Sequence, residues 1–169
     1  MEKTRNKHVL RLAQAAMIAA LYIVLTFIAN LLGIASGAVQ IRFSEALTIL
    51  PYFTVSAVPG LTVGCLLANI LTGCALPDII FGTLATLLGA VFTRLLRKYK
   101  WLAPVPPILA NALIIPPVLY FAYGVKPIWF SLVTVTAGEI ISCGIFGMVL
   151  LTALSKYKNT LFGKQAAAK

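Results

Sequence analysis

The sequence predicts an all-α integral membrane protein: a bundle of six transmembrane helices with both termini in the cytoplasm. Hydrophobic residues make up 60% of the 169 residues and charged residues only 11%, and the mean hydropathy is +0.97. Soluble domains carry roughly a quarter charged residues, so a soluble fold could not cover this much apolar surface with so few charges. The expected solvent is lipid, and each helix then needs roughly 20 residues to cross about 30 Å of hydrocarbon.

The basic residues, which give a net charge of +10, gather at the ends of the apolar runs. Three clusters flank these runs: Lys3, Arg5, Lys7 and Arg11; Arg94, Arg97, Lys98 and Lys100; and Lys156, Lys158, Lys164 and Lys169. With six crossings every cluster falls on one side, and only Arg42 and Lys126 fall on the other. This is the positive-inside pattern of a multi-pass protein of the cell membrane. A nucleic-acid partner is not expected, because a phosphate-binding surface would interleave basic and aromatic residues on a polar face.

Turn signals and charges separate the six expected helices. The helices cover about 9–32, 44–56, 59–71, 78–94, 104–123 and 129–154. The second and third are short, because Pro59-Gly60 divides an uncharged run that is too long for one span. Such helices need not contact lipid along their whole length. Residues 33–42 form an outer loop, and Pro116-Pro117 should kink the fifth helix. Residues 1–160 are expected to form one membrane domain, and residues 161–169 a solvated tail.

Glu139 is the clearest candidate for ligand binding. An ionisable group at membrane depth costs at least roughly 2.5–3.5 kcal/mol on insertion scales, so it usually faces the protein interior and a partner. Glu139 lies about 15 Å into the sixth helix at 1.5 Å per residue. Ser142 and Cys143 share its face one turn later. The alternative is a structural role opposite a buried Arg or Asn.

A second polar group stands at the outer start of the second helix. Glu45 follows Arg42 and Phe43 there, and Thr48 and Tyr52 are expected to project from the same face at i+3 and i+7. Arg42 and Glu45 could form a simple capping ion pair. A carboxylate, a guanidinium and two aromatic rings around one mouth would also suit a flat ligand with hydrogen-bonding edges.

Asp78 and Asn69 are two further candidates near the outer surface. Asp78 opens the fourth helix, where it serves either as an N-terminal cap or as a ligand group. Asn69 can both donate and accept hydrogen bonds, either to a solute or to a neighbouring helix. Asn111, in the fifth helix, is expected to be structural.

The first helix carries a pattern of small residues: Ala15, Ala16, Ala19 and Ala20. Small residues let a second helix approach closely. The approaching helix could belong to this chain or to another protein.

The sequence lacks the motifs of an enzyme or a motor. It contains no P-loop, no HExxH and no nucleophile elbow, and the single histidine, His8, lies in the basic N-terminal segment. With four acidic residues in all, a metal site is not expected. Cys65, Cys74 and Cys143 lack metal-ligand spacing and are interpreted as apolar packing residues. We therefore expect no catalysis and no cofactor, and energised transport would need a motor on another chain.

The segments between positions 42 and 112 are the most distinctive part of the sequence. They are RFSEALTILP at 42–51, AVPG at 57–60, GCLLAN at 64–69, DIIFGTLATL at 78–87 and PPILANA at 106–112. These segments resemble the QueT family, whose members are substrate-binding (S) components of energy-coupling factor (ECF) vitamin transporters. The first segment is quite specific to that family, whereas the others are also compatible with other S components.

The resemblance implies a six-helix S-component fold whose outward-facing pocket is capped by the loop after the first helix. It implies queuosine, queuine or a related 7-deazaguanine precursor as the solute. The implied partners are a transmembrane coupling protein and two ATPase subunits, with Ala15, Ala16, Ala19 and Ala20 as candidates for the contact with the coupling protein.

A deazaguanine presents adjacent N–H donors, which a carboxylate can accept in pairs, and a carbonyl that needs a donor. We therefore expect Glu139 to bind the pairing edge, Glu45 or Asp78 to bind an amine, and Asn69 or Arg42 to donate to the carbonyl. The alternatives are an S component for a different vitamin or nucleobase and an autonomous secondary transporter. A membrane enzyme would need acids or histidines at the cytoplasmic boundary, where this sequence has no such cluster.

Overall fold

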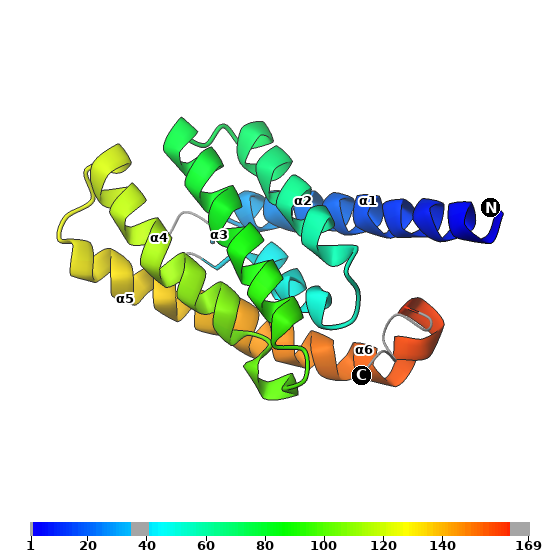
Figure 1. Cartoon of the computed structure of the whole chain (residues 1–169). Coiled ribbons are helices and arrows are strands. Elements are labelled where there is room, and N and C mark those ends of the chain that lie inside the picture. Colours follow the sequence, from blue (N-terminus) through cyan, green and yellow to red (C-terminus); the bar gives the residue numbers. More distant parts are fainter. Residues whose placement is uncertain (1, 35–40, 163–169) are drawn as a thin grey trace.

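The computed structural model describes residues 2–34 and 41–162, and within these ranges the chain is helical and contains no strand. The described residues form six α-helices, which are joined or interrupted by two 3₁₀ helices and one π-helical segment (Figure 1). In chain order the elements are α1 (Glu2–Leu31), η1 (Phe43–Tyr52), α2 (Ala57–Leu71), α3 (Leu76–Leu95), η2 (Lys100–Leu102), α4 (Val105–Tyr123), α5 (Ile128–Glu139), η3 (Ile140–Phe146) and α6 (Gly147–Phe162).

Within the part of the chain that the structure describes, four helical stretches are long and apolar enough to cross a membrane: Lys7–Leu31, Leu76–Leu95, Lys100–Tyr123 and Ile128–Lys158. The last stretch is continuous through α5, η3 and α6 and corresponds to the expected sixth helix. The expected second and third helices correspond to η1 and α2. At about 2.0 Å per residue in a 3₁₀ helix and 1.5 Å in an α-helix, η1 and α2 measure about 20 Å and 22 Å, which is less than the hydrocarbon thickness.

The ends of the helices follow from glycine and proline. Gly73 and Gly124 follow α2 and α4 with φ of 71° and 66°, the left-handed conformation that commonly ends a helix. Pro77 lies in the first turn of α3, where its missing N–H costs no hydrogen bond. The helix α4 continues through Pro116 and Pro117 as far as Tyr123.

Glycines allow neighbouring helices to pack closely. A Cβ on Gly64 of α2 would lie 3.0 Å from Ala19 Cα of α1, and a Cβ on Gly60 would lie 2.7 Å from Ala15 O. On the other side of the bundle, a Cβ on Gly89 of α3 would lie 2.8 Å from Pro107 Cα of α4. These contacts join α1 to α2 and α3 to α4 at close range.

The short helix η1 lies in the centre of the bundle, in contact with α1, α2, α3, η3 and α6. Every residue from Ser44 to Pro51 is buried. Its C-terminal carbonyls are satisfied by a side chain, because Arg94 Nη1 at the end of α3 donates to Pro51 O (3.1 Å) and Tyr52 O (3.4 Å). The short second helix expected from the sequence thus corresponds to a segment that the other helices enclose.

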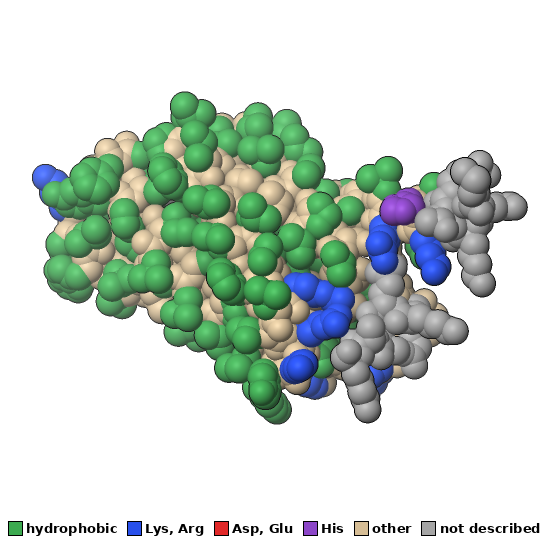
Figure 2. Space-filling view, viewed as in Figure 1, with side chains coloured by type: hydrophobic (Ala, Val, Ile, Leu, Met, Phe, Trp, Pro, Cys, Tyr) green, Lys and Arg blue, Asp and Glu red, His purple; other side chains and the backbone are tan. Residues whose placement is uncertain are grey.

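The start of α1 and the end of α6 lie at the same end of the molecule, and the loop between α4 and α5 lies at the opposite end (Figure 1). Apolar side chains cover most of the face shown in Figure 2, and Lys and Arg gather at the end that holds the start of α1. This distribution is that of a multi-pass membrane protein whose flanking positive charges share one side.

The expected C-terminal tail and the loop after the first helix lie at the edges of the described residues. Leu161 and Phe162, which we expected in the tail, belong to α6, and the ring of Phe162 stacks on Phe53 with centroids 5.1 Å apart. The rest of the expected tail, residues 163–169, lies outside the described residues. So do residues 35–40 of the loop that the family resemblance makes a cap over the pocket.

Candidate functional site

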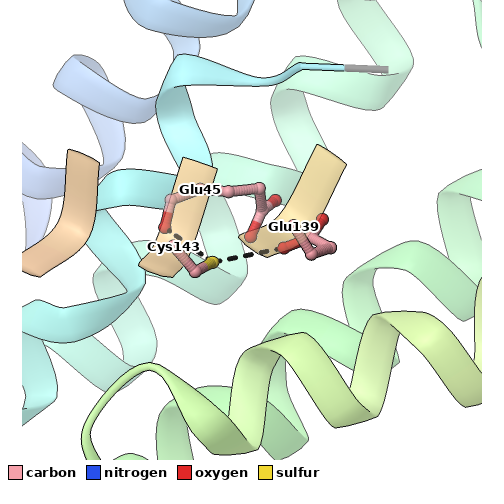
Figure 3. Close-up of side chains that lie close together, drawn as sticks. All are labelled: Glu45, Glu139 and Cys143. Carbon is pink, nitrogen blue, oxygen red and sulfur yellow. Dashed lines mark hydrogen bonds between the residues drawn. The ribbon is translucent and has the colours of Figure 1, made fainter. Parts of the chain in front are cut away.

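Two carboxylates from distant parts of the chain meet inside the bundle. Glu45 lies in the first turn of η1, and Glu139 is the last residue of α5. Their side chains are 2% and 8% exposed, and one oxygen of each lies within 4.8 Å of the other and of Cys143 Sγ. Figure 3 shows the Glu45 side chain extending from η1 towards that of Glu139. Of the residues predicted from the sequence, these two form the centre of the site.

The local backbone brings this cluster together. The helix changes from α to π geometry directly after Glu139, and π-helical segments occur frequently at functional sites. Cys143, in this segment, is fully buried, and its Sγ lies 3.2 Å from Glu139 Oε2 and 3.3 Å from Glu45 O (Figure 3). Thr48 Oγ1 lies 3.2 Å from the same sulfur. The thiol therefore links η1 to the helix that carries Glu139.

Tyr22 of α1 is a member of the site that the sequence analysis missed. Its side chain is 1% exposed, and its hydroxyl donates a hydrogen bond to Glu45 Oε1. The other oxygen, Glu45 Oε2, is buried and has no hydrogen-bond partner among the residues that the structure describes. Tyr22 thus fixes one side of the carboxylate and leaves the other side free to accept a hydrogen bond.

Arg42 and Phe43 border the cluster. The backbone N–H of Arg42 donates to Ser142 Oγ (3.2 Å), which attaches the start of η1 to the π-helical segment. The Arg42 side chain is the cation whose charge acts on both Glu45 and Glu139. The ring of Phe43 packs against Phe146 with centroids 5.9 Å apart.

Further buried polar atoms in and near these elements have no hydrogen-bond partner among the described residues, including Ser44 Oγ of η1 and atoms of Asn111 and Ser131. Asn111 of α4, which we expected to be structural, is 5% exposed and lies near the Glu139 carboxylate, but its Nδ2 forms no hydrogen bond with any described residue. Ser131 lies two turns before Glu139 on the buried face of α5, and its Oγ is also unsatisfied. Buried polar groups are normally paired, so these atoms mark places where a polar ligand would be stabilised.

Asp78 and Asn69 lie outside this cluster, where Asp78 of α3 bonds to Tyr123 of α4 and Asn69 of α2 bonds to the backbone of α3. Asp78 Oδ2 accepts a hydrogen bond from the Tyr123 hydroxyl (3.0 Å), which itself accepts one from the backbone N–H of Ala75 (3.2 Å). Asn69 Nδ2 donates to Asp78 O (3.5 Å) and contacts Cys65 Sγ (3.6 Å). Both residues therefore join α2, α3 and α4 to one another.

Tyr52 lies at the opposite end of η1 from Glu45. Its ring packs edge-on against Phe53, and its carbonyl accepts from Arg94. The physical reason is the type of helix, because a 3₁₀ helix has three residues per turn. Thr48, three residues after Glu45, therefore shares its face, whereas Tyr52, seven residues after Glu45, is rotated away from that face by about 120°. The structure does not bring Tyr52 together with Glu45.

The four alanines of α1 divide between two faces. Ala19 is buried and Ala15 half-buried, and both contact the glycines of α2. Ala16 and Ala20 are exposed on the outer face. Packing within the chain therefore accounts for the first pair and leaves the second pair free to contact another protein.

The cluster is better suited to an organic ligand than to a metal ion. Glu45, Glu139 and Cys143 offer three donor atoms close together, but they mix hard carboxylate oxygens with a soft sulfur. The unsatisfied acceptor atom Glu45 Oε2 and the unsatisfied donor atom Asn111 Nδ2 instead favour a molecule with both N–H and carbonyl groups.

Replacing Tyr22 with Phe should weaken ligand binding by roughly 3- to 10-fold, because one hydrogen bond that orients Glu45 is lost. Tyr52→Phe is the matched control, since Tyr52 lies at the far end of η1. Calorimetric titration of the two purified variants measures the difference. Equal affinities would show that Tyr22 does not position the carboxylate.

Comparison with known proteins agrees with the sequence resemblance. Residues 12–156 match the family described as QueT transporter. A curated relative, "Queuosine precursor transporter QueT" of Lactococcus lactis subsp. cremoris (strain MG1363), is 33% identical over 106 residues. The match covers 60% of this chain and 60% of the relative, so it spans less than two thirds of the relative's length. No solved structure gives a significant match.

The family match covers most of the chain, including η1 and the helix that carries Glu139. The family consists of transporters and not of enzymes, in agreement with the expectation from the motifs. This chain, a multi-pass membrane protein, therefore belongs to the QueT transporter family.

Proposed function

We propose that the protein is the substrate-binding component of an ECF-type importer and captures queuosine, queuine or a related 7-deazaguanine precursor from outside the cell. The observation that carries the proposal is the pair of buried carboxylates, with Glu45 Oε2 and Asn111 Nδ2 unsatisfied beside them. The family match and the name of the Lactococcus lactis relative support the solute class.

A deazaguanine base matches the chemistry of this cluster. Its pairing edge carries adjacent N–H donors, which the Glu139 carboxylate can accept in pairs. Its carbonyl needs a donor, and the candidates are Asn111 Nδ2 and the Arg42 guanidinium. The flat ring would pack against an aromatic wall, for which Phe43 is the nearest candidate on η1.

Several queuosine precursors also carry an amine, which requires a second carboxylate. The sequence left Glu45 and Asp78 as alternatives for this role. We assign it to Glu45, because Glu45 lies beside Glu139 and has a free oxygen, whereas Asp78 is bonded to Tyr123. Asn69 is likewise engaged between α2 and α3 and is assigned a packing role.

Calorimetric titration of the detergent-purified chain with queuine, queuosine and their deazaguanine precursors tests the solute class, with guanine and riboflavin as controls. Saturable binding of a deazaguanine is the expected result. If folded protein binds riboflavin or guanine as well as it binds every deazaguanine, or binds none of them, the queuosine assignment is wrong.

The energy for uptake would come from other subunits in the cell membrane. The family resemblance implies a transmembrane coupling protein and two ATPase subunits, and the positions of the basic clusters favour a cytoplasmic location for both termini of the chain. The outer face of α1 supports an interface with the coupling protein, because Ala16 and Ala20 are exposed there and lie one turn apart.

Enlarging the exposed alanines tests this interface. The double variant Ala16→Leu, Ala20→Leu should lose co-purification with the coupling protein and the ATPase subunits, because close helix approach needs small side chains. Solute binding should be retained, since neither residue contacts the carboxylate cluster. Ala122→Leu, at an exposed position on α4, is the matched control. A complex that assembles equally well with all variants would exclude this face as the interface.

A further inference from the structure

If both carboxylates of the Glu45–Glu139 pair were ionised, they would carry more negative charge than the described groups around them neutralise. Glu45 and Glu139 approach each other inside the bundle, and both are more than nine-tenths buried. The Arg42 side chain supplies one positive charge to two carboxylates. If both were ionised, the empty site would hold a net negative charge in an apolar interior, where an uncompensated charge is strongly disfavoured.

The other groups that face the pair do not compensate this charge. Tyr22 of α1 and Cys143 of η3 donate hydrogen bonds to the two carboxylates but are themselves neutral. Cys65 of α2 also lies near Glu45, and Asn111 of α4 contributes an uncharged amide to Glu139.

Two more charged or polar neighbours belong to the same surroundings. Asp78 of α3 is a further acid, whose charge acts on Arg42. Thr48 of η1 shares a hydrogen bond with Cys143 and is uncharged. Within the described residues, Arg42 is thus the one cation near both Glu45 and Glu139.

We propose that the Glu45–Glu139 pair holds one shared proton while the site is empty and releases it when a cationic ligand binds. The inference rests on the proposed function, and it narrows the solute to a 7-deazaguanine that carries a protonated amine. Two close carboxylates commonly share one proton, because they cannot both ionise at low cost. The ammonium group of the ligand would replace that proton as the second positive charge, and the released proton passes to the solvent.

Geometry provides a place for both the proton and the ammonium group. Glu45 Oε1 and Glu139 Oε2 are occupied by Tyr22 and Cys143, whereas Glu45 Oε2 is buried and unpartnered. An unpaired, buried carboxylate oxygen is the atom at which a proton, or an N–H donor that replaces it, would be most strongly stabilised.

Calorimetric titration in buffers of different ionisation enthalpy measures the protons exchanged on binding. With a 7-aminomethyl-7-deazaguanine as the probe, we expect release of about one proton per ligand, and an affinity that rises up to about tenfold per pH unit while the empty pair holds its proton. A 7-cyano-7-deazaguanine is the matched control, because it has the same ring and no positive charge. It should bind more weakly and release no proton.

The outcomes separate this inference from the proposed function. Binding of the aminomethyl compound without proton release, or equal release with the cyano compound, would overturn the inference and leave the solute class standing. No binding of any deazaguanine would overturn both.

Two further measurements test the assignment to this pair. Glu45→Gln should abolish proton release on binding of the aminomethyl compound. If that variant does not fold, infrared difference spectroscopy of the wild-type protein replaces it. Ligand binding should remove the C=O stretch of a protonated carboxyl group, and an unchanged carboxyl band would overturn the inference.

Discussion

Replacing Glu139 with Gln should weaken binding of the deazaguanine solute roughly 10- to 150-fold. A hydrogen bond to a charged group contributes about 1.5–3 kcal/mol, and each 1.4 kcal/mol changes Kd tenfold. Gln has nearly the shape of Glu but offers one acceptor and one NH₂ group, so it opposes the pairing-edge N–H donors with a donor of its own. Calorimetric titration of the purified variant measures the change.

Asp78→Asn is the informative comparison for this variant. Asp78 is also a buried acid, but its carboxylate bonds to Tyr123 at the junction of α3 and α4. The affinity of the Asp78→Asn variant for the solute should stay within about twofold of wild type, since no direct contact with the solute is lost. If Asp78→Asn weakens binding as much as Glu139→Gln does, the binding site extends to Asp78 and the assignment of the amine to Glu45 is wrong. If Glu139→Gln binds normally, the pairing-edge assignment fails.

Replacing Gly64 with Ala should lower the free energy of unfolding by about 1–3 kcal/mol and weaken solute binding as well. The new methyl group would lie 2.9 Å from Tyr22 Cβ and 3.0 Å from Ala19 Cα. Neither atom is at the end of a flexible side chain, so α1 must move away from α2, and overpacking of this kind typically costs this much. The same movement displaces Tyr22 from Glu45, which couples the packing defect to the site.

Thermal unfolding in detergent and calorimetric titration together measure this effect. Gly144→Ala is the matched control, because its new Cβ would meet only Ile140 Cγ2 at 3.7 Å and Ile108 Cδ1 at 3.9 Å, which are ordinary contacts. Unchanged stability and affinity in Gly64→Ala would contradict this prediction. They would mean that α1 and α2 accommodate the methyl group without cost and that the hydrogen bond between Tyr22 and Glu45 is kept.

The sequence predicts the membrane class, the long helices and the two central acids for clear physical reasons. Apolar runs must match the thickness of the bilayer, and a carboxylate at membrane depth is too costly to be accidental. Glu139 and Glu45 could therefore be singled out without a structure. The short second helix was also predictable, because Pro59-Gly60 divides its apolar run.

The rest of the site depends on information that a single sequence does not carry. Tyr22 is a tyrosine within an apolar helix, and nothing local distinguishes it from an aromatic residue that faces lipid. Asn111 was interpreted as structural, because only the packing of α4 reveals that its Nδ2 is unsatisfied. The face on which Tyr52 lies was wrongly inferred from α-helical periodicity, whereas η1 is a 3₁₀ helix.

The shortness of η1 and α2 also has a consequence for the order in which the protein is assembled. A segment of about 20 Å cannot satisfy its terminal backbone groups at both membrane surfaces, and unsatisfied groups are not tolerated in lipid. The terminal carbonyls of η1 receive their donor, Arg94, from the end of α3, which leaves the ribosome later. Residues 43–71 therefore cannot settle as independent spans during insertion. They reach their final position only after α3 has been synthesised, and Glu45 meets Glu139 only after α5 follows.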